Sequence, residues 1–182
     1  MVDKAISINR NCARAWLNRG NIFARFKNDN DEAKKCYEKA HQLDPKLHEA
    51  ITNLGNLLYL GDRFVDAAYK YLAALELDPE DSESLCNLGM ALGKTKYREF
   101  ATLAFDEAIT SGSGNEMIIT NYLYFLLDTK NWTKFDQVII HASKYIGDAQ
   151  VKTFKQIRGD FFKALKDVKE SVVLENNLDR EI

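Results

Sequence analysis

The chain has 182 residues, of which 46% are hydrophobic and 29% are charged, so it carries enough apolar material for a core and disorder is not expected. Its 25 basic and 27 acidic residues give a formal net charge of −2 without a block of like charge, which argues against the clustered basic surface of a nucleic-acid-binding protein. Only 2 prolines and 9 glycines are present, as expected for a helical protein with short turns.

A 34-residue pattern recurs three times between residues 13 and 115. Each copy places a glycine in its first half, then an alanine, an aromatic residue and a second alanine. The small residues let two helices lie close together, and the aromatic residue fills the space between them. The recurring residues are Trp16, Gly20, Ala33, Tyr37, Ala40 and Pro45 in 13–47, Leu54, Gly55, Ala67, Tyr71, Ala74 and Pro79 in 48–81, and Leu88, Gly89, Ala101, Phe105 and Ala108 in 82–115.

This spacing resembles that of the tetratricopeptide repeat (TPR) family, in which each repeat is a pair of helices. The resemblance implies an all-α fold, a right-handed α-solenoid of helix-turn-helix repeats whose first helices line a concave groove. In 13–47 one extra residue is expected in the turn 28–30, where an insertion costs little. In 82–115 the proline is missing, and we expect Gly112 to end the second helix within the loop 112–115.

The pattern weakens after residue 115. In 116–147, Leu123 stands at the glycine position and Phe135 at the first alanine position, which predicts a degenerate fourth repeat with a wider or shifted helix pair. In 148–178 we expect a degenerate fifth repeat or C-terminal cap, with a short helix, a turn at Gly159–Phe161 and a second helix. One kinked terminal helix is the alternative.

The first residues, 2–10, fit the trailing second helix of a preceding repeat. Ala5 precedes Trp16 by eleven residues, the same separation as between Ala40 and Ile51. Because a half repeat cannot bury its apolar face well, we expect that 1–182, a single solenoid, comes from a longer array. End-to-end self-association, or stacking on further repeats of the same chain, is therefore one hypothesis for its partners.

Asparagine occupies one position of the first helix in all four repeats, and a second line of residues follows one helical turn later. The TPR resemblance implies that this position points into the groove, like the asparagine ladder of the O-linked N-acetylglucosamine transferase superhelix. An amide can pair with the backbone of an extended peptide of any sequence; the alternative is that these amides bond within or between helices. The candidate peptide-binding residues are Asn18, Asn21, Asn53, Asn56, Asn87, Asn121, Tyr59, Met90 and Tyr124, and the rest of the groove is expected to contain Arg14, Leu17, Arg25, Thr52, Glu83, Cys86, Lys94, Met117 and Thr120.

One binding mode of the family is rejected on charge. TPR domains that hold the C-terminal carboxylate of heat-shock chaperones use three cations together with two asparagines. At the corresponding positions Asn21 and Asn53 are present, but Leu17, Glu83 and Asn87 replace the cations. Since Glu83 has the wrong sign for a carboxylate ligand, we do not expect a chaperone clamp.

Catalytic and metal-binding constellations are absent from the sequence. His41, His48 and His141 lack metal-ligand spacing, and no phosphate loop, G-x-S-x-G or H-E-x-x-H motif occurs. The odd number of cysteines, without C-x-x-C spacing, argues against disulfides or zinc and favours a reducing compartment. We therefore expect no enzyme, no cofactor and no bound metal.

The partners and location follow from the same observations. Apolar runs such as 122–127 are far too short for a membrane span, and the polar N-terminus is unlike a signal peptide. We expect a cytoplasmic protein–protein interaction scaffold that binds an extended protein or peptide segment, without nucleic acid. The alternative is an architectural segment of a longer array that self-associates or positions another domain.

Overall fold

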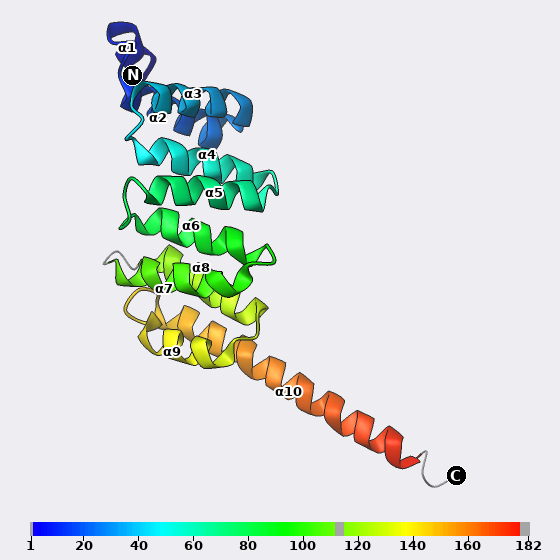
Figure 1. Cartoon of the computed structure of the whole chain (residues 1–182). Coiled ribbons are helices and arrows are strands. Elements are labelled where there is room, and N and C mark those ends of the chain that lie inside the picture. Colours follow the sequence, from blue (N-terminus) through cyan, green and yellow to red (C-terminus); the bar gives the residue numbers. More distant parts are fainter. Residues whose placement is uncertain (1, 112–114, 179–182) are drawn as a thin grey trace. The chain divides into compact units, whose positions relative to one another are not determined.

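The computed structural model describes residues 2–111 and 115–178, which form an all-α arrangement (Figure 1). The predicted Gly112 cap lies outside the described residues. Two compact units are present, 1–114 and 115–182. The helices of the first unit are α1 (Val2–Ile8), α2 (Ala13–Ile22), η1 (Phe23–Lys27), α3 (Asn30–Leu43), α4 (His48–Leu60), α5 (Phe64–Leu75), α6 (Ser82–Gly93), η2 (Arg98–Phe100) and α7 (Ala101–Thr110); those of the second are α8 (Glu116–Asp128), α9 (Trp132–Ala142) and α10 (Asp148–Leu178).

The first unit is a stack of helix pairs. Helices α2 and α3, α4 and α5, and α6 and α7 pack against each other, and α3 and α5 in turn contact the first helix of the next pair. The core contains small and aromatic residues that repeat along the stack, with Ala33, Ala67 and Ala101 each fully buried. Apolar burial between successive pairs therefore stabilises the unit, as in repeat proteins generally.

A glycine of the first helix lies against an aromatic ring of the second in each of these pairs. A Cβ at Gly20 would lie 2.5 Å from Cε1 of Tyr37, and one at Gly55 would lie 2.6 Å from Cε1 of Tyr71. At Gly89 the nearest ring atoms belong to Phe105, at 2.9 Å. These distances leave no room for a methyl group, so glycine is required for the close approach of the helices.

The extra residue of the first pair is accommodated differently from the expectation. Helix α2 continues into η1, a π-helical turn, and Asn28 then takes a left-handed conformation with φ of 51°. Asp62 takes the same conformation after α4. From Phe23 to Asn28 the chain advances five residues, but from the equivalent Leu58 to Asp62 it advances four. The insertion therefore lies inside the helix, as a π-bulge, rather than in the turn.

The second unit begins with the helix pair α8 and α9. Leu123 and Phe135, the bulky residues at the close-packing positions, are both fully buried. They replace the glycine and the alanine of the other pairs, so the same space is filled by two large side chains. Asn115 and Asn131 cap the N-termini of α8 and α9 by accepting hydrogen bonds from backbone N–H groups.

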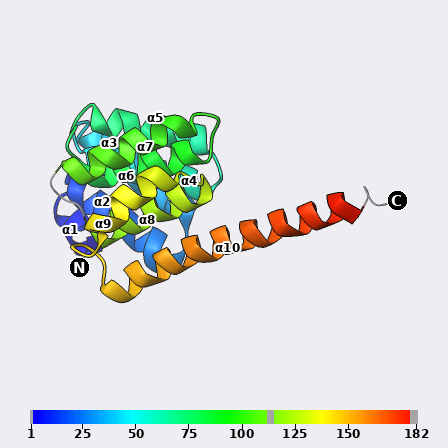
Figure 2. The same ribbon diagram turned by 90° about the horizontal axis from the view of Figure 1, so that it is seen from below.

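The expected turn at Gly159–Phe161 is wrong, because α10 is one continuous helix from Asp148 to Leu178 (Figure 2). Val151 and Phe154 are buried near its start. A glycine in a helix costs only about 1 kcal/mol relative to alanine, and side-chain contacts of the residues that flank Gly159 favour the helix. Gln156 donates to Asp160 one turn later at 2.8 Å.

An aromatic cluster anchors the middle of α10 to the start of α9. The ring of Trp132 lies 5.0 Å from that of Phe161 and 5.2 Å from that of Phe162, between centroids. Arg158 stacks over Trp132 and Phe162 and donates to Asp136 at 2.7 Å. Trp132 also contacts Phe135, so it covers the bulky fourth pair.

The glycine–ring contact can be tested by Gly55→Ala. The new methyl group would overlap the Tyr71 ring, which is 1% exposed and has little space to move. Overpacking costs about 1–3 kcal/mol, more than the gain in helix propensity of about 1 kcal/mol, so we expect a lower free energy of unfolding in urea. Gly159→Ala is the matched control, because nothing lies within 4 Å of its Cβ position, and it should raise stability. Equal effects of the two substitutions would contradict the packing argument.

Candidate functional site

Four asparagines of the first unit form a continuous hydrogen-bond relay along α2, α4 and α6. Nδ2 of Asn53 donates to Oδ1 of Asn21 at 3.1 Å, and Nδ2 of Asn56 donates to Oδ1 of Asn53 at 3.4 Å. Nδ2 of Asn87 then donates to Oδ1 of Asn56 at 3.0 Å. We call Asn21, Asn53, Asn56 and Asn87 the asparagine relay; it joins three successive repeats through side chains alone.

Two buried tyrosines orient the relay. The Tyr37 hydroxyl donates to Oδ1 of Asn21 at 2.9 Å, and the Tyr71 hydroxyl donates to Oδ1 of Asn56 at 2.8 Å. Burial raises the pKa of Tyr37 to about 12 and also raises the pKa of Tyr71. Both hydroxyls therefore remain protonated donors throughout the physiological pH range.

The sequence carries a signal for this pairing that the repeat pattern alone did not show. Asn21 follows Gly20, and Asn56 follows Gly55, so each amide lies beside the glycine that admits the ring. In the third pair Met90 follows Gly89, and the ring is Phe105, which has no hydroxyl. Asparagine is thus present where the ring can donate a hydrogen bond and absent where it cannot, which assigns Tyr37 and Tyr71 a role beyond core packing.

The relay leaves its members with different capacities for a partner. A carbonyl oxygen accepts two hydrogen bonds, and Oδ1 of Asn21 and of Asn56 each accept two already. Asn87 is only 6% exposed. Asn53 is half-buried, and the hydrogen bond that its Oδ1 accepts from Asn56 leaves a second lone pair. Asn53 is therefore the relay member best able to offer both a donor and an acceptor.

The other predicted site residues are dispersed. Asn18 is exposed on α2, and Met90 is half-buried on α6. Tyr59 packs edge-on against Phe64 at the α4–α5 turn. On α8, Asn121 is half-buried and Tyr124 packs against Phe154 of α10; both belong to the second unit. Cys86 is fully buried, so its expected place on the groove surface is wrong.

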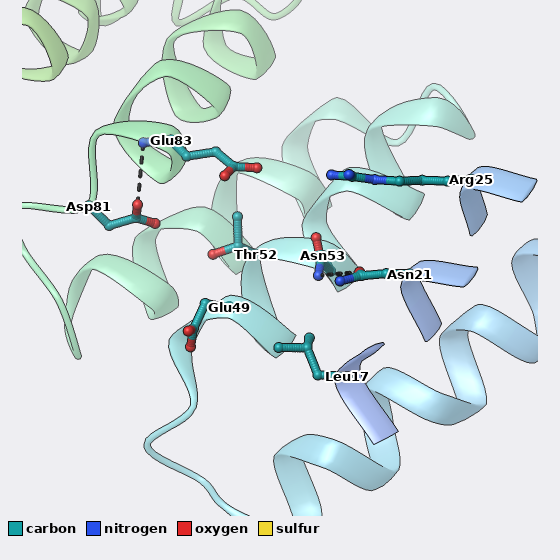
Figure 3. A pocket seen from close by; sticks show the side chains of 8 residues that line it. All are labelled: Leu17, Asn21, Arg25, Glu49, Thr52, Asn53, Asp81 and Glu83. Carbon is teal, nitrogen blue, oxygen red and sulfur yellow. Dashed lines mark hydrogen bonds between the residues drawn. The ribbon is translucent and has the colours of Figure 1, made fainter. Parts of the chain in front are cut away.

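A hollow of about 200 Å³ lies beside the relay and is lined mainly by residues of α2, α4 and the start of α6 (Figure 3). Figure 3 shows the amides of Asn21 and Asn53 at its middle, Arg25 at one side and Asp81 at the other. Leu17 contributes an apolar wall. The lining residues are Leu17, Asn21, Arg25, Glu49, Thr52, Asn53, Asp81 and Glu83. The sequence had placed six of them in the groove but missed Glu49 and Asp81.

Carboxylates dominate the charge of this hollow. Three of them, from Glu49, Asp81 and Glu83, line the hollow together with one guanidinium, that of Arg25. Burial and then the charge of Asp81 raise the pKa of Glu83, whereas Arg25 and His48 act in the opposite direction. The hollow therefore disfavours a further negative charge.

The neighbouring interactions hold the carboxylates in place. Oδ1 and Oδ2 of Asp81 cap α6 by accepting from the backbone N–H groups of Glu83 and Ser84. His48 lies 3.6 Å from carboxylate oxygens of both Glu49 and Asp81. Beneath them, the hydroxyls of Thr52 and Ser84 are 2.7 Å apart in a buried hydrogen bond. Two successive repeats are thus fixed to one another directly at the hollow.

A double-mutant cycle tests the tyrosine–asparagine pair. Tyr71→Phe removes one hydrogen bond and should lower the free energy of unfolding by about 0.5–1.5 kcal/mol. Asn56→Met should cost more, because it leaves the buried hydroxyl without its acceptor. The double variant reproduces the Met90–Phe105 pair, so we expect it to cost less than the sum, with a coupling of about 0.5–3 kcal/mol. Tyr69→Phe, at an exposed tyrosine of the same helix, is the control. If the effects of the two single substitutions simply add in the double variant, the proposed coupling between Tyr71 and Asn56 is contradicted.

In the part of the chain that the structure describes, no helix is both long enough and apolar enough to cross a bilayer. Within the same residues, no group of three or more His, Cys, Asp or Glu side chains could hold a metal ion.

Comparisons with known proteins point to one family. Two family models, both described as tetratricopeptide repeat, match residues 13–47 and 70–98. Protein bimA of Emericella nidulans is 25% identical over 65% of this chain, and the match spans 15% of its own length. The small glutamine-rich tetratricopeptide repeat-containing protein 2 of Mycosarcoma maydis is 28% identical over 59% of this chain and 30% of its own length. The matched region is thus less than a third of either relative.

A solved structure shares the fold. PilF of Pseudomonas aeruginosa superposes with a TM-score of 0.70 at 20% identity, over 92% of this chain and 81% of that one. The two family matches and the stacked helix pairs show that the chain contains tetratricopeptide repeats, and the likeness to PilF shows the fold that the two chains share.

Proposed function

We propose that the face formed by α2, α4 and α6 of this protein–protein interaction scaffold binds an extended segment of a partner protein, without catalysing a reaction. The observation that carries the proposal is the amide of Asn53. It is held by the asparagine relay, retains a donor and an acceptor position, and opens on the hollow. An amide so oriented matches the alternating C=O and N–H groups of an extended backbone.

The strength of such binding is bounded by hydrogen-bond energetics. Each net bond contributes about 0.5–1.5 kcal/mol, and the relay has few positions left for a partner. Backbone pairing alone therefore supports an affinity no tighter than about micromolar. Because Asn21 and Asn56 already use both acceptor positions, their role in this proposal is to orient Asn53 and Asn87.

The proposal can be tested with a phage-displayed library of random nonapeptides. Peptides enriched on the chain should bind with micromolar Kd, and Asn53→Ala should weaken them about fivefold, since about 1 kcal/mol of hydrogen bonding is lost. The substitution also removes two hydrogen bonds of the asparagine relay, so the melting temperature should fall by several degrees, and the Kd is measured well below that temperature. Asn30→Ala, at an exposed asparagine that starts α3, is the control. Peptides that are insensitive to Asn53→Ala but sensitive to substitutions around Asn30 would place binding on another surface.

The second candidate is end-to-end self-association, favoured by the N-terminal helix. Ile6 of α1 is buried, whereas Ile8 is 78% exposed, so α1 presents a large apolar side chain to solvent. We expect light scattering to show mass increasing with concentration, and Ile8→Lys to reduce that increase because a charge disfavours burial. A constant mass near 20.8 kDa at all concentrations would leave the peptide-binding proposal as the only candidate. A cytoplasmic location remains a prediction.

A further inference from the structure

The lining of the hollow beside Asn53 changes from apolar to charged along its length. Leu17, which is 6% exposed, offers an apolar wall next to Asn53. Figure 3 shows the carboxylates of Glu49 and Asp81 on one side of Thr52 and the guanidinium of Arg25 on the other, with the Glu83 side chain extended toward Arg25. An apolar wall that leads to carboxylates suits a ligand with an aliphatic stem and a charged end.

The sign of that charged end follows from the lining. Three carboxylates and one guanidinium give the hollow a formal charge of −2, which attracts cations and repels anions at this short range. The Arg14–Glu49 ion pair, at 3.3 Å, does not cancel this preference, because the Arg14 side chain is 72% exposed and exposed ion pairs are weak. A cation of the ligand can therefore replace Arg14 at Glu49.

We propose that the hollow receives a lysine or arginine side chain of the bound segment, with its stem against Leu17 and its cationic end beside Glu49 and Glu83. This inference rests on the proposed function, because the backbone of the same segment would pair with Asn53. The asparagine relay then binds any extended backbone, and the hollow selects which side chain lies beside it. The raised pKa of Glu83 is consistent with the proposal, since a nearby cation would relieve the unfavourable surroundings of its carboxylate.

Small side-chain analogues test the charge preference directly. The isotope-labelled 182-residue chain is titrated with N-acetyl methylamides of lysine, arginine, norleucine and glutamate, and its amide NMR signals are followed. Lysine and arginine analogues should bind with millimolar Kd and shift signals around Thr52, Asn53 and Glu83. Norleucine, which keeps the stem without the charge, and glutamate, which reverses the charge, should bind at least fivefold more weakly.

A matched pair of variants localises the effect. Glu83→Gln should weaken the lysine analogue at least threefold. Glu80→Gln removes the same charge from an exposed residue of the neighbouring loop, outside the hollow, and should leave the affinity unchanged. Equal affinity of all four analogues, stronger binding of glutamate, or no effect of Glu83→Gln would overturn the inference.

The library-selected peptides separate this inference from the proposed function. If they lose affinity with Asn53→Ala and also when their basic residue is replaced by norleucine, both stand. If they depend on Asn53 but tolerate norleucine, the selection of a cation is overturned and backbone binding survives. If the lysine analogue binds at Glu83 but no peptide depends on Asn53, the hollow is a cation site and the proposed function is overturned.

Discussion

The close approach of a glycine to an aromatic ring is the contact on which the rest of the first unit depends. At Gly20 and Gly55 no methyl group fits beneath the ring, so the two helices of a pair lie nearer than ordinary side chains allow. That separation brings the tyrosine hydroxyls within 2.9 Å of the amides of Asn21 and Asn56. The packing constraint and the polar network are therefore one feature, which places each asparagine directly after its glycine.

The asparagine relay also explains why polar groups are tolerated between these helices. A half-buried amide without partners would destabilise the fold by about 1–3 kcal/mol. Here each carbonyl of Asn21 and Asn56 accepts a hydroxyl from its own repeat and an amide from the next. The relay thus satisfies its own members and couples adjacent repeats, in addition to the apolar contacts. The interhelical bonding that the sequence offered as the alternative is present among these amides, and peptide binding in the groove stays a prediction.

The repeat pattern predicted the helix pairs and their core because each close-packing position accepts few residue types. It could not locate the extra residue of the first pair, since a π turn and a longer loop have the same length in sequence. Nor could it predict that α10 continues through Gly159. The residues that flank this glycine contact Trp132 and Asp136, which lie more than twenty residues earlier in the chain. The hollow was only partly predictable. Glu49 lies in the first turn of α4 and Asp81 directly precedes α6, and the 34-residue template assigns no function to either position.

Recognition of a particular partner requires more than the asparagine relay can supply. Amides that pair with a peptide backbone bind every sequence about equally, so discrimination has to come from a neighbouring group that contacts side chains. The hollow meets this requirement because side chains of α2, η1, α4 and α6 and of the loop before α6 line it. Substitution of one lining carboxylate changes its charge without touching the glycine–ring contacts or the tyrosine–amide bonds. Apart from Asp81, which also caps α6, the carboxylates that set the charge of the hollow are therefore separate from the residues that hold the helix pairs together.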